Sequence, residues 1–136
     1  MIEKKILVVD DEETTRVFLE RTISEFGYRV ELACSAEDAL DKIKNEEFQL
    51  IITDLKMPEI DGAELCRQIR SRNFETVIYA LSGYITEFEP EKLHDIGFDG
   101  HLCKPVNGAV LKSAIEGAFA AIYQREKRQN DQKSAS

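Results

Sequence analysis

The sequence has few cysteines and no long hydrophobic run, and each of these absences excludes a class of protein. Its three cysteines, Cys34, Cys66 and Cys103, are widely spaced and odd in number, so they fit neither a disulfide framework nor the paired ligands of a zinc site. We expect them to be small buried residues in a reducing compartment. The longest apolar run, Ala118 to Tyr123, is far shorter than the roughly 20 residues of a membrane-spanning helix. The N-terminus also lacks the apolar stretch of a signal peptide, so we expect a cytoplasmic protein without membrane contact.

Basic surface is also scarce. The formal net charge is −8, and residues 1–124 carry 14 basic and 24 acidic side chains, whereas the residues from Arg125 onward are more basic than acidic. No basic stripe with interleaved aromatic residues occurs, and an acidic body is repelled by a phosphate backbone. We therefore expect no direct binding to nucleic acid.

A chain of 136 residues fits one domain with a sizeable core. Short apolar runs alternate with helical patterns, and the runs at 5–10, 50–53 and 77–81 show almost no polar alternation. Uninterrupted apolar strands are typical of a parallel sheet that helices cover on both faces. The five expected strands are Lys5–Asp10, Arg29–Ala33, Leu50–Thr53, Val77–Leu81 and Gly100–Cys103.

Helical spacing and capping residues mark five helices between and after these strands. Ser35 and Asp61 are each followed three residues later by an acid, which is the signature of a helix N-terminus. Pro90 fits only the first turn of a helix, so the fourth helix should begin near Glu89. The apolar patterns span 19–26, 35–43, 61–69, 92–96 and 110–123.

Five alternating units predict an α/β fold of the flavodoxin-like kind, a doubly wound five-stranded parallel sheet of order 2-1-3-4-5 with five helices. We expect one domain at residues 1–124. Residues 125–136 are polar and lack apolar periodicity, so they should form a disordered tail or an extension of the last helix.

Polar residues stand where four of the expected strands end. The run ILVVDDEE, Ile6 to Glu13, passes from a buried strand straight into four acids. Such acids repel one another unless a cation lies between them or they charge the first turn of a helix. Ligands of open α/β sheets bind at the carboxyl ends of the strands. We therefore expect one crevice to hold the side chains at the ends of these strands, namely Asp10, Asp11, Asp54, Ser82 and Lys104.

These same residues carry a family resemblance. The segments VVDDEE, LIITDLKMPEIDG, LSG and HLCKP resemble the signature blocks of response-regulator receiver domains. The intervals of 43 residues from Asp11 to Asp54, 28 to Ser82 and 22 to Lys104 are similar to those of that family. The resemblance covers residues 3–124.

The resemblance implies a role for each residue. Asp54 would be the phosphoacceptor, with Ser82 as the hydroxyl that turns toward the phosphoryl group and Lys104 as its cationic partner. Mg²⁺ would be held by Asp10, Asp11, Asp54 and the backbone carbonyl of Lys56. A cis peptide would join Lys104 to Pro105.

Chemistry supports this set independently. A carboxylate attacks an anionic phosphoryl group only if a hard cation and an ammonium neutralise the charge. The backbone N–H groups of Leu55 and Gly83 could approach the same oxygens. We interpret Glu12 and Glu13 as first-turn charges of a helix.

Some positions depart from the family pattern or belong to the scaffold. His101 stands where receivers commonly have a tyrosine or phenylalanine switch, and it is either a switch that can change charge or an inconsequential surface residue. Met57, Pro58 and Gly62 are interpreted as structural. Tyr84, like Lys56, would flank the path of water to a phosphoryl group, and residues 83–89 should form the most mobile loop.

The sequence thus predicts a signalling module and not a true enzyme, one that catalyses only its own phosphorylation and dephosphorylation. A histidine kinase or phosphotransfer protein would supply the phosphoryl group from a phosphohistidine. The face formed by the fourth helix, fifth strand and fifth helix would then bind a downstream target, an output domain or a second copy. Two alternatives are a Mg²⁺-dependent small-molecule phosphatase or phosphotransferase, for which no substrate insert or glycine-rich loop is visible, and a docking pseudo-receiver that is never phosphorylated.

Overall fold

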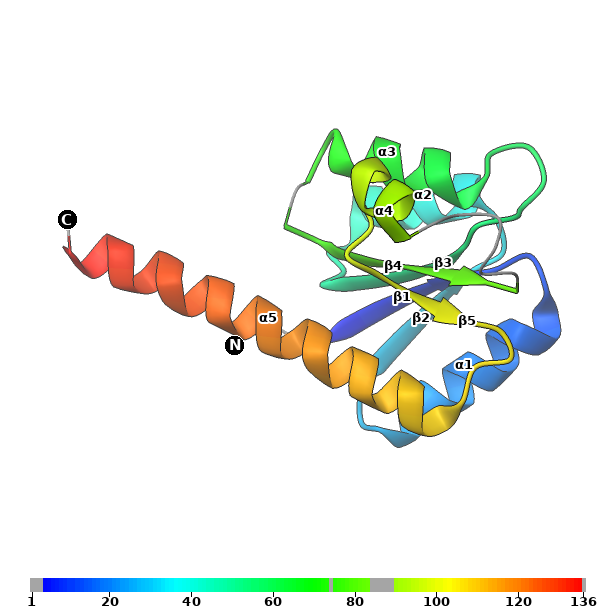
Figure 1. Cartoon of the computed structure of the whole chain (residues 1–136), viewed down its shortest axis with the longest axis horizontal. Coiled ribbons are helices and arrows are strands. Elements are labelled where there is room, and N and C mark those ends of the chain that lie inside the picture. The colour runs from blue at the N-terminus through cyan, green and yellow to red at the C-terminus, as the bar shows by residue number, and fades with distance from the viewer. Residues whose placement is uncertain (1–3, 74, 84–89, 136) are drawn as a thin grey trace.

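In the computed structural model, which describes residues 4–73, 75–83 and 90–135, a central parallel sheet lies between two layers of helices (Figure 1). The strand order is β2-β1-β3-β4-β5. This order and the helical layers confirm the predicted fold class. The strands are β1 (Lys5–Val9), β2 (Arg29–Ala33), β3 (Leu50–Asp54), β4 (Val77–Ser82) and β5 (Gly100–Cys103).

Alternate residues of the central strands face opposite helical layers, because successive side chains of a strand point to opposite faces. On one face Leu7 and Ile51 pack with the layer of α2, α3 and α4. On the other face Ile6 and Leu50 pack with Leu19 of α1 and with α5. The helices are α1 (Glu13–Glu25), α2 (Ala36–Asn45), α3 (Gly62–Arg70), α4 (Pro90–Ile96) and α5 (Gly108–Ala135).

The two predicted N-caps are confirmed. The Ser35 hydroxyl accepts a hydrogen bond from the Asp38 N–H at 3.0 Å, and the Asp61 carboxylate accepts one from the Glu64 N–H at 2.9 Å. Each bond satisfies a backbone donor that the first turn of a helix leaves without an intrahelical partner. The Asp61 cap fixes where α3 begins, eight residues after the phosphoacceptor candidate Asp54.

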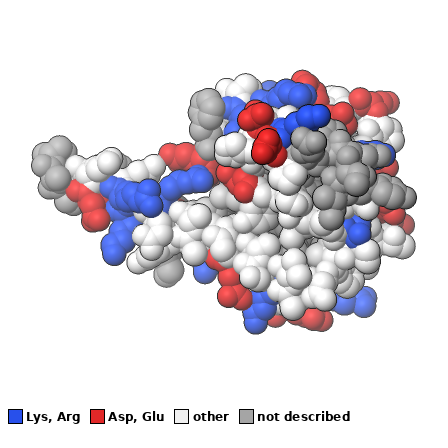
Figure 2. Space-filling model, in the orientation of Figure 1, with Lys and Arg blue, Asp and Glu red and all other residues white. Residues whose placement is uncertain are grey.

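The last helix is longer than its apolar pattern indicated. α5 continues through the polar residues after Gln124 and ends at Ala135, so this segment is a helical extension in the structure. Figure 1 shows it projecting beyond the sheet, and Figure 2 shows Lys and Arg side chains gathered on the projecting part. The prediction that one domain ends at residue 124 is not tested by this geometry.

Burial corrects the expectation for the cysteines. Cys66 is buried on α3, where removal from water raises the pKa of its thiol to about 11. Cys34 and Cys103 are exposed. Cys103 lies on the edge strand β5, next to the buried Leu102, so alternation turns its side chain away from the core.

Some sequence expectations concern the connection before α4. The described part of α4 begins at Pro90, so the expected helix start near Glu89 falls at the limit of the described residues. The expected mobility of the 83–89 loop and the role of Tyr84 fall on residues 84–89, which lie outside the described residues. None of the described helices combines the length and apolar composition needed to cross a membrane.

Candidate functional site

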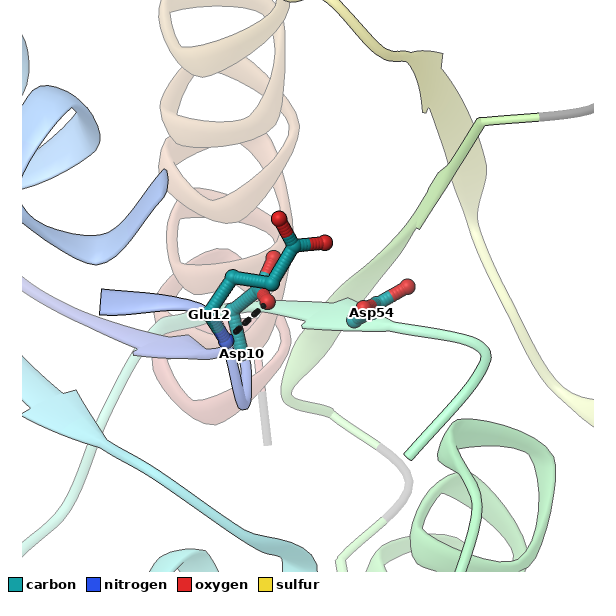
Figure 3. Close-up of side chains that lie close together, drawn as sticks. All are labelled: Asp10, Glu12 and Asp54. Carbon is teal, nitrogen blue, oxygen red and sulfur yellow. Dashed lines mark hydrogen bonds between the residues drawn. The ribbon is translucent and has the colours of Figure 1, made fainter. Parts of the chain in front are cut away.

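Three acidic side chains converge at the carboxyl edge of the sheet. Asp10 follows β1, Glu12 precedes α1, and Asp54 ends β3. One carboxylate oxygen from each lies within 4.8 Å of the others, and Figure 3 shows the three side chains gathered at this edge. Asp10 is fully buried and Asp54 is 6% exposed, so this charge cluster lies at the margin of the apolar core.

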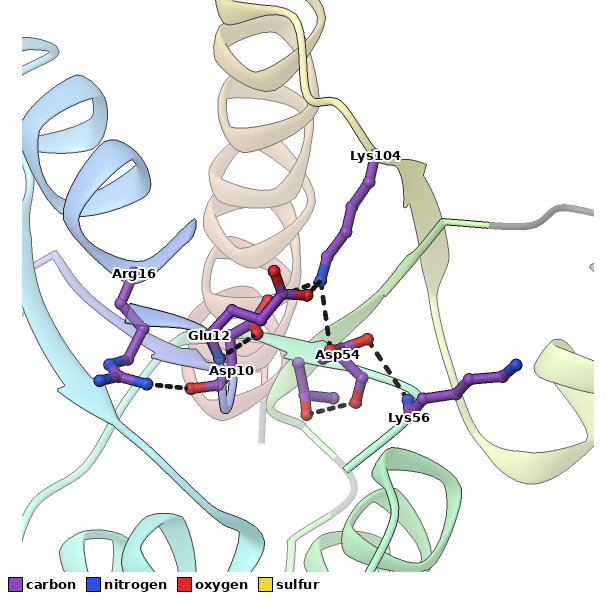
Figure 4. A network of polar contacts seen from close by, with 7 residues as sticks. Asp10, Glu12, Arg16, Asp54, Lys56 and Lys104 are labelled. Atoms are coloured by element: carbon purple, nitrogen blue, oxygen red, sulfur yellow. Dashed lines mark hydrogen bonds and ion pairs between the residues drawn. The ribbon is translucent and has the colours of Figure 1, made fainter. Parts of the chain in front are cut away.

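Lys104 brings a positive charge into the cluster. Its ammonium nitrogen lies 3.0 Å from Asp10 Oδ2, 3.2 Å from Asp54 Oδ2 and 3.4 Å from Glu12 Oε1 (Figure 4). Burial alone would lower the pKa of this group, but the hydrogen bonds and negative charges of Asp10 and Asp54 raise it to about 12. Lys104 therefore remains protonated and acts as an internal counterion of the carboxylates.

The surroundings of Asp54 disfavour its negative charge. Burial is the largest cause that raises the pKa of Asp54, and repulsion by Asp10 adds to it. Lys104 and the backbone N–H of Lys56, which lies 3.3 Å from Asp54 Oδ1, act in the opposite direction without reversing the shift. The negative charge of Asp54 is unfavourable in these surroundings when it is alone, and a cation bound beside it would stabilise that charge.

Asp10 offers the most direct indication of a cation site. Its Oδ2 is buried, and the Lys104 ammonium at 3.0 Å is its one polar contact within the described part of the chain. Carboxylate oxygens are the ligands that Mg²⁺ prefers, and Mg²⁺ is bound by few protein carboxylates with water completing its shell. The residues present therefore fit a magnesium ion.

The structure differs from the sequence analysis in which acid accompanies Asp10 and Asp54. Glu12, interpreted from the sequence as a helix charge, is the N-cap residue of α1, but its side chain makes no capping bond and contacts Lys104 instead. Asp11 is exposed and is not one of the three grouped carboxylates. The role of Asp11 as a metal ligand stays a prediction.

The backbone donors near Asp54 have different partners. The Leu55 N–H donates to the Leu81 carbonyl at 3.1 Å, so it could reach a phosphoryl group only by giving up that bond. The Lys56 N–H, in contrast, points at the Asp54 carboxylate. Gly83 is exposed, and a Cβ there would meet nothing within 4 Å.

The two switch candidates lie on neighbouring strands. Ser82 is half-buried at the end of β4, and its carbonyl accepts a hydrogen bond from the Lys104 N–H at 2.8 Å. His101 is exposed on β5, where it pairs with Ala80. The expected cis peptide between Lys104 and Pro105 is present.

A glycine brings helix α3 close to Asp54. A Cβ added to Gly62 would lie 2.1 Å from the Asp54 carbonyl oxygen, and the Gly62 N–H donates to the Leu55 carbonyl at 3.0 Å. Only a residue without a side chain allows this approach. The predicted structural role of Gly62 is thus explained by its contact with the backbone of Asp54.

An apolar groove lies beside the charge cluster. Phe18 and Leu19 of α1 line it together with Pro105 and Val106, and Lys104 stands at its edge; its volume is about 490 Å³. Phe18 is 46% exposed although it is large and apolar. Such an exposed apolar surface suits contact with another molecule.

Comparisons with known proteins agree with this arrangement. A family model described as response regulator receiver domain matches residues 6–116. The chain is 36% identical over 115 residues to the alkaline phosphatase synthesis transcriptional regulatory protein PhoP of Bacillus subtilis, covering 85% of this chain and 48% of that protein. It is 36% identical over 135 residues to the response regulator MprA of Mycobacterium avium, covering 97% of this chain and 56% of that protein. The chain thus spans about half the length of these two relatives.

Solved structures show the same fold. The Vibrio cholerae chemotaxis protein CheY4 superposes with a TM-score of 0.80 at 29% identity, covering 86% of this chain and 99% of that one. A CheY-like receiver domain protein from Methanospirillum hungatei superposes with a TM-score of 0.83 at 28% identity, covering 91% of this chain and 99% of that one. Both matched chains are covered almost completely by the region that contains the acidic cluster.

Proposed function

This chain belongs to the response regulator receiver domain family, and from that premise we propose that Asp54 accepts a phosphoryl group from the phosphohistidine of a histidine kinase or phosphotransfer protein. A receiver domain is a signalling module and not a classical enzyme. The observation that carries the proposal is the position of Asp54, which is almost buried and shares the ammonium of Lys104 with Asp10.

The transfer needs a nucleophile and neutralisation of charge. A carboxylate oxygen of Asp54 attacks phosphorus while the bond from phosphorus to the histidine nitrogen breaks, and that nitrogen keeps the electron pair. Lys104 already contacts Asp54 at 3.2 Å and would neutralise a phosphoryl oxygen, as cationic groups do in other phosphoryl transfers. The Ser82 hydroxyl and the Gly83 N–H would donate to further oxygens.

Mg²⁺ is the proposed cofactor. Asp10, Asp11, Asp54 and the backbone carbonyl of Lys56 would hold it, and Glu12 lies close enough to add charge to the site. When bound, the ion lowers the repulsion between the carboxylates and the phosphoryl oxygens.

Phosphorylation would switch a protein-interaction face. The added charge of about −2 would draw Ser82 toward the phosphoryl group and bias His101 between two positions, which changes the face formed by α4, β5 and α5. A downstream target, an output domain or a second copy would bind there. The apolar groove beside Lys104 would be the surface that contacts the phosphoryl donor.

We further propose that the receiver domain comprises residues 1–124 and that the protein is cytoplasmic.

Mass spectrometry after incubation with Mg²⁺ and acetyl phosphate tests the assignment. We expect one added phosphoryl group on the wild type, one on Asp41→Asn, which alters an exposed aspartate of α2, and none on Asp54→Asn. Labelling of Asp54→Asn to the wild-type extent would refute Asp54 as the acceptor.

A further inference from the structure

Arg16 contacts the backbone of the acidic loop, the segment Asp10–Glu12 between β1 and α1, from the side opposite Lys104 (Figure 4). It lies near the start of α1 and is half-buried, and its Nη1 donates a hydrogen bond to the Asp10 carbonyl oxygen at 2.7 Å. We propose that Arg16 is a positioning residue, which holds the Asp10 carboxylate in the orientation that binds Mg²⁺. This inference rests on the proposed function.

The contacts of Asp10 show what Arg16 adds. Asp10 is the first residue beyond β1, and its N–H donates to the Ala33 carbonyl at 3.1 Å. Its Oδ1 accepts a hydrogen bond from the Glu12 N–H at 2.9 Å. With its carbonyl bound by Arg16, three polar groups of Asp10 are fixed and Oδ2 is the one that faces the site. A charged donor forms a shorter and stronger bond than a neutral one, so Arg16 is well suited to resist rotation of this peptide.

Arg16 is itself fixed by its helix. Its N–H donates to the Glu12 carbonyl at 3.1 Å, and α1 is packed on the sheet through Leu19 and Ile23, which are fully buried. The guanidinium therefore connects the acidic loop to the core rather than to a mobile surface. Groups that orient metal ligands in this way commonly change metal affinity by 10- to 100-fold when they are removed.

A positioning role and simple electrostatics predict opposite changes in Mg²⁺ affinity when Arg16 is removed. Arg16 is a positive charge next to a cluster of carboxylates, so by Coulomb's law its removal should strengthen the binding of a cation. If the main role of Arg16 is to position Asp10, its removal should weaken that binding. The sign of the change in Mg²⁺ affinity consequently separates the two roles.

The test compares Arg16→Gln with Arg21→Gln. Arg21 is an exposed residue of the same helix, so the control changes the net charge equally. Titration calorimetry with Mg²⁺ alone should show affinity about tenfold weaker in Arg16→Gln and within about twofold of wild type in Arg21→Gln. Arg16→Lys keeps the charge and one donor, and should recover part of the loss. Urea unfolding reports the folded fraction of each variant, so that affinities refer to folded protein.

The outcomes are distinguishable. If the wild type binds Mg²⁺ and accepts phosphate from acetyl phosphate, but Arg16→Gln binds Mg²⁺ as tightly as Arg21→Gln or more tightly, the positioning role is wrong and the proposed function stands. A loss of stability in Arg16→Gln without a loss of affinity would overturn it equally. If the wild type neither binds Mg²⁺ nor becomes phosphorylated, the proposed function fails and this inference fails with it.

Discussion

At the scale of single residues, Lys104 balances the negative charge of the carboxylates in the site. Lys104 contacts carboxylates from three positions of the chain, and two of them, Asp10 and Asp54, are nearly inaccessible to water. Charges in such a setting are screened little by salt. The site thus contains its own positive charge among the acids, and the third carboxylate, Glu12, is the one exposed to solvent.

Mg²⁺ titration of single variants tests which acids bind the ion. We expect Asp11→Asn to weaken binding most, Asp10→Asn to weaken it less but by at least the roughly tenfold expected for Arg16→Gln, and Glu12→Gln to weaken it only a few-fold because its side chain is 61% exposed. Exposed charges contribute little to local interactions. Glu13→Gln, which changes an exposed first-turn residue of α1, is the control. Unchanged affinity in Asp11→Asn would assign the site to Asp10, Glu12 and Asp54.

The pKa of Asp54 leads to a prediction about pH. Because burial and Asp10 raise this pKa, the folded state favours the protonated acid, and that favourable contribution is lost as pH rises through the raised value. Asp54→Asn cannot ionise, so without metal it should be more stable than wild type at pH 7. The difference should shrink below the ordinary value of 3.8.

Thermal unfolding in a chelator from pH 3 to pH 7 measures this difference. Asp41→Asn, on the exposed face of α2, provides the comparison and should show no such trend. A stabilisation by Asp54→Asn that is greatest in acid would contradict the assigned cause.

The sequence is sufficient to place Asp10, Asp54 and Lys104 together, since each follows a strand of one parallel sheet and such strands end at one edge. It is not sufficient to predict the contact of Glu12 with Lys104. Whether the Glu12 side chain caps α1 or turns to Lys104 depends on a contact between residues 92 positions apart. The Leu55 N–H is a similar case. Its engagement with Leu81 follows from the pairing of β3 with β4, which no local pattern encodes.

Among the elements, the connection from β3 to α3 constrains the backbone of Asp54. Gly62 lies against the Asp54 carbonyl, and Glu59 has a φ of 67°, a left-handed conformation that is uncommon outside glycine, asparagine and aspartate. The caps of α2 and α3 were predictable because they depend on residues three apart. The length of α5 was not, because its polar end is in contact with Glu75, more than 50 positions away.

Gly62→Ala should damage both fold and site. Its Cβ would meet backbone atoms of Asp54 and Leu55 at 2.1 and 2.9 Å, so α3 or the end of β3 must shift. We expect a loss of about 1–3 kcal/mol in the free energy of unfolding, together with slower labelling by acetyl phosphate.

Gly117→Ala is the matched control, because a Cβ in this part of α5 meets nothing within 4 Å. It should stabilise the protein by up to about 1 kcal/mol through helix propensity and leave labelling unchanged. Urea unfolding measures both changes. Wild-type stability and labelling in Gly62→Ala would show that the backbone yields without cost.

At the scale of the whole molecule, the site and the projecting part of α5 lie at opposite ends of the sheet (Figure 1). Arg125 donates to the Glu75 carbonyl, and the Gln129 amide donates to the Glu75 carboxylate at 2.9 Å. These contacts attach α5 to the segment just before β4, the strand that ends in Ser82. Strand β4 therefore connects the segment that contacts α5 with Ser82 at the site.

Amide hydrogen exchange tests whether these contacts support the extension. Protection in α5 should extend to about Gln129 in the wild type and retreat by about one turn when Arg125 and Gln129 are both changed to alanine, because isolated short helices are marginal in water. Lys127→Ala, an exposed change between them, should have no such effect. Equal protection in all three proteins would mean that the helix is maintained by its own propensity.

The length of α5 has a mechanical consequence. Its 28 residues make a rod of about 42 Å, of which the residues beyond the Gln129 contact extend about 9 Å. A rod held near one end acts as a lever, so a tilt of about 10° at Gln129 would move its far end by about 2 Å. Movements too small to see at the sheet would be magnified there. A spin label or fluorophore near Gln132 would thus be a sensitive gauge of small rearrangements in the body.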